Sequence, residues 1–303
     1  MSDQLELSII GVDGSKWDVS GPEAGAQGVE MLPKTKQLLS DTPAKTFWIK
    51  SGGGSQRYQG FNYQRRDPMF GFSVYGRTPG EWRDIDSRFR MALGNYNDQF
   101  TCNAVTQPDD QFRELNIRLL QQPDPWNSSW EGKDPHLYCE STVMIDGACE
   151  TPHWVGPMEV DSWTLPSGTS GSHTFMEANP GDVPIFKRWV VNAPSAVILP
   201  DFSYGQEQDF QRPVGADAAR TVPLPVLVSG EDSDVDTNDN NEYIVAANGA
   251  PVWMRTGGNF AFYPIAPHTP PTAVPFSVSG ATTGFTVTLE MDRWYSRAWG
   301  VSL

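Results

Sequence analysis

Cysteine is scarce in this sequence, with three residues among 303. They are Cys102, Cys139 and Cys149, and an odd number at irregular spacing is not the framework of a disulfide-stapled secreted domain. Long apolar runs are also missing, because no stretch approaches the roughly 18 apolar residues of a membrane-spanning helix. The opening residues, MSDQLELSII, lack the basic start and apolar core of a signal peptide. We therefore expect a chain without a membrane span that folds in a reducing cytosol.

Basic residues are few as well. The chain has 22 Lys and Arg against 37 Asp and Glu, which gives a formal net charge of −15. Binding to phosphate backbones or to anionic lipid needs concentrated positive charge, and Arg65-Arg66 is an isolated basic pair. The composition therefore predicts no sequence-specific nucleic-acid binding and no attachment to a membrane surface.

Glycine and proline are abundant, with 28 and 25 residues, and they favour turns and short strands over helices. Residues 79–93 form the one clear helical pattern. Thr78 can cap its start, Glu81 completes a capping box, Pro79 suits the first helical position, and Gly94 provides a stop. A helix this short is marginal alone, so its apolar stripe should pack on a sheet. Its Arg/Asp face is a candidate contact with a neighbouring subunit. The stripe consists of Trp82, Ile85, Phe89, Ala92 and Leu93.

Alternating apolar and polar residues elsewhere predict a mainly β chain. The length favours two domains, at the usual size of about 150 residues each. The pattern breaks around residues 150–157, so we predict an N-terminal β-sandwich or barrel-like domain over 1–155 and a C-terminal β-sandwich over 156–303. Residues 51–55 read as a flexible Gly-rich tip, 162–179 as a polar segment, and 292–303 as an aromatic tail. Strands are expected at 5–9, 17–19, 43–50, 58–63, 68–75, 100–105, 112–120, 137–145, 185–192, 196–199, 221–228, 242–247, 250–254, 260–263, 275–278 and 285–291.

Catalytic and metal-binding motifs were sought without success, so the sequence predicts no catalytic, cofactor-binding or metal-binding residues and no cofactor. The acidic run 231–242 resembles a calcium loop, but Thr237 stands where the sharp turn needs glycine and Tyr243 stands where the last ligand should be glutamate. A solvated turn explains the run better. Residues 167–172, SGTSGS, come nearest to a nucleophile elbow and lack its final glycine. The four histidines have no metal-site spacing and read as loop or surface residues: His136, His153, His173 and His268.

Several motifs, taken in order, resemble the minor tail proteins of long-tailed phages that infect actinobacteria. The resemblance covers nearly the whole chain, and the order of the motifs is more specific than any one of them. The closing motif has Ala298 where the pattern has proline. The motifs are DGSxW at 13–17, GPxAGAxGV at 21–29, KTxW at 45–48, RD at 66–67, the helix with EW at 81–82 and DSxFR at 86–90, DPHL at 134–137, LPDFS at 199–203, GED at 230–232, VDT at 235–237, AANG at 246–249, YPI at 263–265 and WxSRxWG at 294–300.

Within that group the chain is most similar to the distal tail protein family. The resemblance implies an N-terminal domain that forms a hexameric ring continuing the tail tube, and a galectin-like C-terminal sandwich outside it. The ring would join the tube and its tape measure protein to the baseplate hub, and would support peripheral tail-tip proteins used in host attachment. The family has no catalytic residues to carry over. It places the chain at the virion tail tip, assembled in the host cytoplasm. We predict separately that the loop with Gly52, Gly53 and Gly54 contacts a neighbouring ring. An acidic lumen would let DNA slide without sticking.

Other functions remain open on the sequence alone. The many aromatic residues are compatible with a carbohydrate- or receptor-binding module, although they also serve cores and interfaces. Paired carboxylates could serve a polysaccharide hydrolase. Another minor tail protein, such as part of the hub, is a further alternative. Six copies per ring would support the distal tail role, whereas three would indicate the hub.

Overall fold

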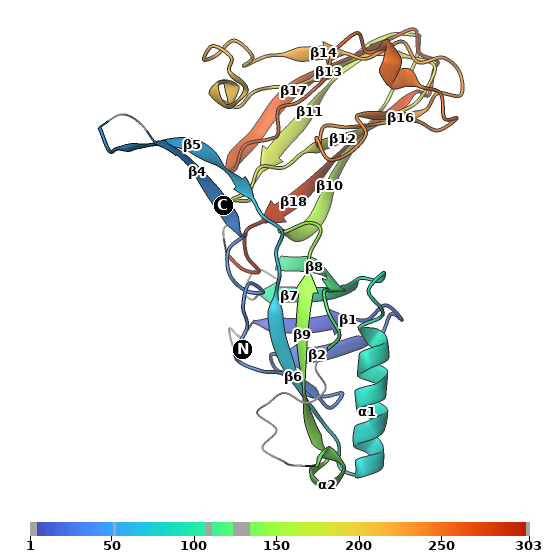
Figure 1. Ribbon diagram of the computed structural model, residues 1–303. Coiled ribbons are helices and arrows are strands. Elements are labelled where there is room, and N and C mark those ends of the chain that lie inside the picture. The colour runs from blue at the N-terminus through green and yellow to red at the C-terminus, as the bar shows by residue number, and fades with distance from the viewer. Residues whose placement is uncertain (1–4, 51–52, 107–110, 124–133, 301–303) are drawn as a thin grey trace. The chain divides into compact units, whose positions relative to one another are not determined.

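The computed structural model describes residues 5–50, 53–106, 111–123 and 134–300 (Figure 1). The chain is mainly β and its sheets are antiparallel, as the sequence predicts. It divides into two compact units: residues 1–156 with 295–300, and residues 157–294 with 301–303. Each unit has its own cluster of buried hydrophobic side chains. None of the helices in the described part of the chain is long and apolar enough to cross a membrane.

Seven strands of the first unit pair in the order β3-β6-β9-β8-β7-β1-β2. The two ends of this order, β2 and β3, contact each other, so the sheet curls around its core. The alternation in the sequence explains the burial, because every second side chain of β9 is buried. The strands are β1 (Glu6–Ile10), β2 (Lys16–Ser20), β3 (Val29–Met31), β6 (Met69–Tyr75), β7 (Phe100–Thr106), β8 (Gln111–Leu119) and β9 (Glu140–Ala148).

The predicted helix is present as α1 (Pro79–Ala92). Thr78 accepts a hydrogen bond from the backbone N–H of Glu81 at 3.2 Å, and the Glu81 carboxylate accepts one from the backbone of Arg77 at 2.8 Å. The carboxylate thus reaches one residue further back than in an ordinary capping box. Gly94 adopts a φ of 69° just after the helix, which favours glycine there. Trp82, Ile85, Phe89 and Ala92 are buried, as the stripe predicts.

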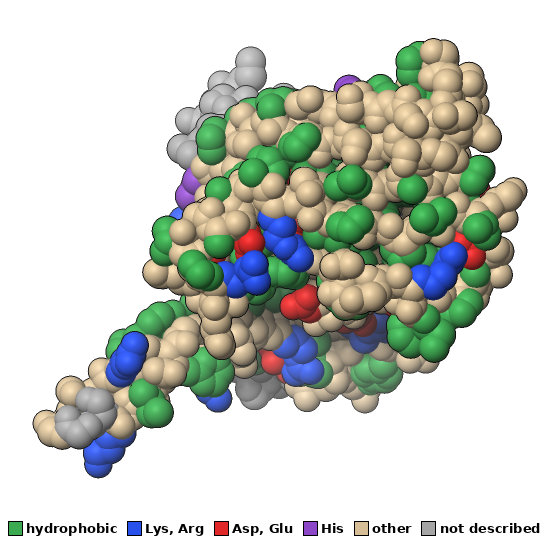
Figure 2. Space-filling model, turned by 90° about the horizontal axis from the view of Figure 1, so that it is seen from above, with side chains coloured by type: hydrophobic (Ala, Val, Ile, Leu, Met, Phe, Trp, Pro, Cys, Tyr) green, Lys and Arg blue, Asp and Glu red, His purple; other side chains and the backbone are tan. Residues whose placement is uncertain are grey.

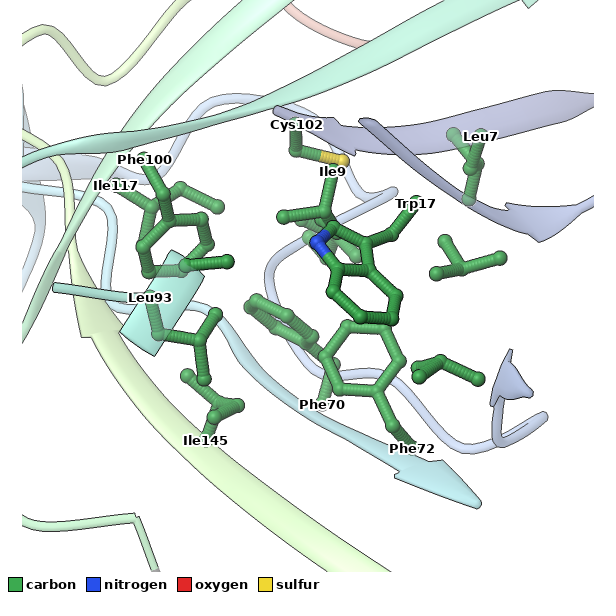
Figure 3. Packing of buried hydrophobic residues seen from close by; sticks show 14 of the residues in the cluster. Leu7, Ile9, Trp17, Phe70, Phe72, Leu93, Phe100, Cys102, Ile117 and Ile145 are labelled. Carbon is green, nitrogen blue, oxygen red and sulfur yellow. The ribbon is translucent and has the colours of Figure 1, made fainter. Parts of the chain in front are cut away.

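Aromatic side chains fill the core of the first unit (Figure 3). Phe89 of α1 meets the edge or face of Trp17 and Phe72, with ring centroids 5.2 and 4.9 Å apart. Such edge-to-face pairs add a small stabilisation beyond that gained from burying their large apolar area. The helix is therefore held by the sheet rather than by its own propensity.

The second unit consists of two sheets on either side of one core. One sheet has the order β16-β15-β12-β18-β10 and the other β11-β17-β13-β14. Phe175 of β11 packs edge-on against Trp189 of β12 at 5.1 Å and so joins the two sheets. The elements are β10 (Trp154–Thr164), β11 (Gly171–Asn179), β12 (Lys187–Val191), β13 (Ala196–Pro200), β14 (Thr221–Pro223), β15 (Ser233–Asp236), β16 (Ile244–Ala246), β17 (Thr269–Ser279) and β18 (Thr286–Tyr295), with 3₁₀ helices η1 (Glu207–Phe210) and η2 (Val252–Arg255).

Several expected elements differ from the structure. The segment expected as a strand from 137 begins with a short helix, α2 (Pro135–Tyr138), because Asp134 caps it and Cys139 ends it with a φ of 55°. The polar segment 162–179 contains all of β11 and the end of β10. The start of the acidic run, read as a turn, forms β15, since Ser233 and Val235 point into the core. Residues 250–254 and 260–263 are not strands.

His153 lies in a loop as expected but is buried there, whereas His173 lies in a strand rather than in a loop or on the surface. His153 is 5% exposed, and its Nδ1 is 3.0 Å from the hydroxyl of Thr42. His173 lies in β11, where it stacks on Trp163 with centroids 5.5 Å apart. His136 lies in α2 and His268 in an exposed turn with a φ of 56°.

Candidate assembly surface

Two strands of the first unit pair only with each other. They are β4 (Ala44–Lys50) and β5 (Gln56–Tyr63), and we call residues 44–63 the arm. One extra residue, Gln59, bulges where Phe47 pairs with Gly60 and Trp48 with Tyr58, and Gly60 has a φ of 126°. A two-stranded hairpin is marginally stable alone in water. The arm therefore needs either a firm base or a partner.

The arm presents large apolar side chains to solvent on both strands. The exposed fractions are 40% for Phe47, 55% for Trp48, 54% for Ile49, 48% for Tyr58 and 47% for Phe61. Trp48 and Tyr58 pack edge-on across the strands with centroids 5.3 Å apart, which keeps them together without burying them. Contiguous exposed apolar surface of this kind marks an interaction site.

The charge of the arm is opposite to that of the chain. Between residues 44 and 63 there are three basic side chains, Lys45, Lys50 and Arg57, and no Asp or Glu. The whole chain carries −15, so the part outside the arm carries −18. Figure 2 shows basic and hydrophobic side chains interleaved along the arm, which extends to the lower left. This combination fits an acidic protein surface with apolar patches.

Arg66 holds the base of the arm. Its guanidinium is buried and donates six hydrogen bonds, at 2.6 to 3.3 Å. The acceptors are backbone oxygens of Gln37, Leu38, Ser40, Pro152 and Ser296, and the hydroxyl of Thr42. Burial lowers the pKa of Arg66 to about 10, which still leaves the side chain charged at neutral pH. The chain just before and just after the arm is thus fixed to the first unit.

A second buried arginine fixes the C-terminal segment to the same unit. Arg113 of β8 donates to the backbone oxygens of Arg297 at 2.7 Å and Gly300 at 2.5 Å. Its guanidinium lies over the ring of Tyr295, 3.6 Å from the centroid. Residues 295–300 therefore complete the first unit, although they follow the whole of the second unit in sequence.

The charged face of α1 is engaged mainly within the helix. Arg88 pairs with Asp84 at 3.0 Å and Arg90 with Asp86 at 2.9 Å, each one turn apart. The Arg88–Asp84 pair is exposed, whereas the side chains of Arg90 and Asp86 are half-buried. An exposed pair of this kind contributes only a few tenths of a kcal/mol. A contact of this face with a neighbouring subunit stays a prediction.

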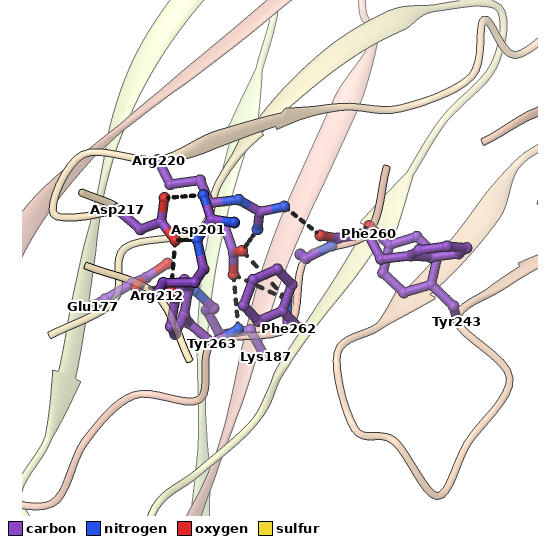
Figure 4. A network of polar contacts seen from close by, with 11 residues as sticks. Glu177, Lys187, Asp201, Arg212, Asp217, Arg220, Tyr243, Phe260, Phe262 and Tyr263 are labelled. Carbon is purple, nitrogen blue, oxygen red and sulfur yellow. Dashed lines mark hydrogen bonds and ion pairs between the residues drawn. The ribbon is translucent and has the colours of Figure 1, made fainter. Parts of the chain in front are cut away.

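Buried charge in the second unit forms a network around Asp201 rather than a reactive site (Figure 4). Asp201 accepts from the backbone N–H groups of Phe262 and Tyr263 and pairs with Arg220. Asp217 accepts from the Tyr263 hydroxyl at 2.6 Å, and burial followed by this bond raises the pKa of Tyr263 to about 12. Each carboxylate is occupied by backbone or arginine donors, which is how a protein positions a loop. Across the described residues, no three His, Cys, Asp or Glu side chains gather as metal ligands would.

Two of the three glycines expected to contact a neighbouring ring can be placed. Gly53 and Gly54 lie at the tip of the arm with φ of 85° and 86°, and a Cβ at either would meet nothing within 4 Å. Gly52 lies outside the described residues. Sequence reasoning predicted the tip and the strands at 43–50 and 58–63 that carry it, but it did not predict that these strands form an exposed apolar and basic surface. The signal was available, because residues 42–66 contain no Asp or Glu.

Comparison with solved structures places the fold in a class found in phage adsorption machinery. The chain is similar to the Dit protein of phage SPP1, described as a paradigm of the hub adsorption apparatus of phages that infect Gram-positive bacteria. The TM-score is 0.57 and the identity 11%, over 94% of this chain and 98% of that one. At this identity the likeness concerns the fold alone. No family model matches the sequence.

Sequence comparison then gives particular relatives. The chain is 26% identical to minor tail protein Gp27 of Mycobacterium phage L5 and equally to that of Mycobacterium phage D29. In both cases the similarity covers 97% of this chain and 98% of the relative. The resemblance to minor tail proteins of actinobacterial phages, which the ordered motifs indicated, is thereby confirmed.

Proposed function

We propose that this chain is a structural, non-enzymatic subunit of a phage tail tip that acts as a distal tail protein. The observation that carries the proposal is the sequence similarity to two phage minor tail proteins, which covers 97% of this chain and 98% of each relative. The fold shared with the SPP1 Dit protein supports it.

In this proposal residues 1–155 form a hexameric ring that continues the tail tube and meets the baseplate hub. Residues 156–303 supply a galectin-like sandwich on the outside of the ring. The neighbours would be the tail tube protein, the tape measure protein, a hub or tail-associated protein, and peripheral tail-tip proteins. Assembly would occur in the host cytoplasm. Identical subunits in a closed ring use head-to-tail interfaces, so each needs two different and complementary surfaces.

The arm supplies one of these two surfaces, and it binds to a second copy of this chain. The arm is basic and apolar, whereas the rest of the chain is strongly acidic, so arm and body of two copies are complementary in charge. The exposed rings of Trp48 and Phe61 provide the kind of aromatic anchors that carry binding energy at interfaces. Once the basic arm is bound to a neighbouring copy, the surface that is left exposed is acidic. That surface can face the lumen of the ring and repel DNA.

The number of copies tests the proposal directly. Cryo-EM of intact particles should show this chain as a ring of six between tube and hub. Three copies would assign this chain to the hub instead, and a single copy would rule out a ring built from this chain. Mass photometry of the purified chain at increasing concentration should show species larger than the monomer.

Reversing the charge of the arm should weaken self-association. The variant Lys45→Glu/Lys50→Glu/Arg57→Glu replaces three attractions by three repulsions. Since each exposed pair is worth roughly 0.5 kcal/mol, we expect at least about a tenfold weaker self-association. Sedimentation equilibrium would measure it, and added salt should weaken the wild type in the same direction.

The control changes the net charge equally outside the arm. Lys16, Lys34 and Lys36 are exposed residues of the first unit, and their replacement by Glu should have a much smaller effect. Equal association of the arm variant and wild type would show that the arm is not the contact. Normal tail assembly after deletion of residues 52–54 would separately reject the predicted role of the tip.

A further inference from the structure

The second unit has a groove that lies outside the residues proposed to form the ring. Two adjoining hollows, of about 410 and 150 Å³, share the side chains of Asp236, Asn238 and Asn241 as a common wall. Their combined size falls in the range of small-molecule sites. Aromatic residues line both hollows: Tyr243, Phe260 and Phe262 in the larger, and Phe186 and Trp294 in the smaller.

The polar wall is held rigid by hydrogen bonds within its own loop. Asp236 accepts from the backbone N–H of Asn238 at 2.8 Å and from the side-chain amide of Asn241 at 2.7 Å. Asn238 in turn accepts from the backbone N–H of Asn240 at 3.1 Å through Oδ1. A carboxylate can accept about four hydrogen bonds and an amide can donate two. Asp236 therefore keeps acceptor capacity, and within the described residues the Asn238 Nδ2 makes no hydrogen bond, so its two N–H groups are available to a ligand.

The aromatic wall is fixed from behind. Arg220 donates to the backbone oxygen of Phe260 at 2.9 Å and lies over the ring of Phe262, 4.2 Å from its centroid. The Tyr243 hydroxyl accepts from the backbone of Ala261 at 3.0 Å, and the rings of Tyr243 and Phe260 meet edge to face at 5.0 Å. Figure 4 shows these two rings beside each other, next to the Asp201 network. Phe260 still exposes 40% of its surface.

The charge of the groove excludes anionic ligands. Asp236, Asp239, Glu290 and Asp292 line it, against Arg188 and the buried Lys187, which pairs with Glu177. Burial raises the pKa of Asp292, and the nearby Asp236 and Glu290 raise it further, so negative charge is already crowded here. Phosphates, uronates and sialic acids would be repelled. A neutral ligand with many hydroxyls would not.

We propose that this groove binds a neutral saccharide, with Asp236 and the Asn238 amide bonding its hydroxyls and Phe260 packing on its ring. The C–H groups on one face of a pyranose or furanose pack well on an aromatic ring, while its hydroxyls both donate and accept. Planar Asp and Asn side chains match such paired hydroxyls. Because both walls are fixed before binding, little conformational entropy is lost on binding. The site lies within the second unit and does not depend on the proposed ring.

The full chain should be tested on an array of neutral glucose, galactose, mannose and arabinose oligosaccharides beside sialylated and glucuronate-containing ones. We expect binding to at least one neutral class and none to the acidic classes. Isothermal titration with the best neutral oligosaccharide then gives the dissociation constant. Phe260→Ala and Asn238→Asp should each weaken it at least tenfold, the latter because it keeps the loop-fixing oxygen and removes the donors. Trp253→Ala, which removes another exposed aromatic side chain outside the groove, should leave it unchanged.

Three outcomes would overturn the proposal. The first is an array without any neutral ligand above background. The second is equal weakening by Trp253→Ala and Phe260→Ala, which would indicate non-specific aromatic contact. The third is binding of choline in place of sugars, since an acidic aromatic groove is also the chemistry of a cation site. Circular dichroism of each variant separates loss of the fold from loss of the site.

Discussion

Replacing Arg66 with methionine is expected to lower the free energy of unfolding of the first unit by about 3–5 kcal/mol, the range for removing one member of a buried charged network. The substitution keeps much of the side-chain volume but removes all six hydrogen bonds. Five backbone oxygens would then lose this donor. Those of Leu38 and Ser296 keep a bond from Trp154 and Thr42, and each buried oxygen left without a partner costs about 1–3 kcal/mol before relaxation. Urea unfolding, followed with a probe in the first unit, would measure the loss.

The neighbouring arginine provides the control. Arg65 has a side chain that is 57% exposed and pairs only with Asp67, at 2.7 Å. Arg65→Met should therefore change stability by no more than about 0.5 kcal/mol. Arg66→Lys should fall close to Arg66→Met, because an ammonium has three donors and cannot reach acceptors spread around a planar guanidinium. Similar stability of Arg65→Met and Arg66→Met would show that the buried network does not hold the unit together.

The second large effect concerns the ion pair inside the second unit. Lys187 and Glu177 are both fully buried, with Nζ and Oε2 3.4 Å apart, and the same oxygen accepts from the Tyr204 hydroxyl at 2.5 Å. Lys187→Met leaves a carboxylate buried without its counter-charge, and Glu177→Leu leaves an ammonium. Each single variant should lose about 3–5 kcal/mol of unfolding free energy, measured by urea denaturation.

The double variant distinguishes a charge effect from a packing effect. Lys187→Met/Glu177→Leu removes both charges together, so it should be considerably more stable than the sum of the single losses predicts, with a coupling of at least about 1 kcal/mol. Burial and the nearby Glu177 raise the pKa of Tyr204, so this hydroxyl remains a donor at any ordinary pH. Additive losses would contradict the view that the two charges stabilise each other.

Local patterns predicted those elements whose signals lie within a few residues. The helix was found because Thr78, Pro79 and Gly94 mark its ends and a regular apolar stripe lies between them. β11 was missed because Ser172 and Thr174 face outward and its inward face carries the polar His173, Glu177 and Asn179 beside Phe175. Residues 260–263 read as a strand from their aromatic content. In the structure the backbone N–H groups of Phe262 and Tyr263 donate to the Asp201 carboxylate instead of a neighbouring strand.

The candidate surfaces depend on contacts far apart in sequence, which no local pattern can show. Arg66 and Ser296 are separated by 230 residues, and nothing in a basic pair beside an aspartate indicates that one arginine is buried and the other exposed. The groove of the second unit likewise joins the loop at 236–243 to the segment at 260–262. In contrast, the arm could have been found from sequence, because a stretch without acidic residues is conspicuous in so acidic a chain.

The packing of residues 295–300 against Arg113 and Arg66 has a consequence for synthesis. The second unit is an insertion that is joined covalently to the first unit at both of its ends. A single cleavage at one of these two connections would therefore not separate the two units while residues 295–300 stay bound to the first. During translation residues 295–300 emerge only after residues 157–294, so the first unit cannot be completed until this inserted stretch has been made. The unit whose strands are made first is therefore completed second.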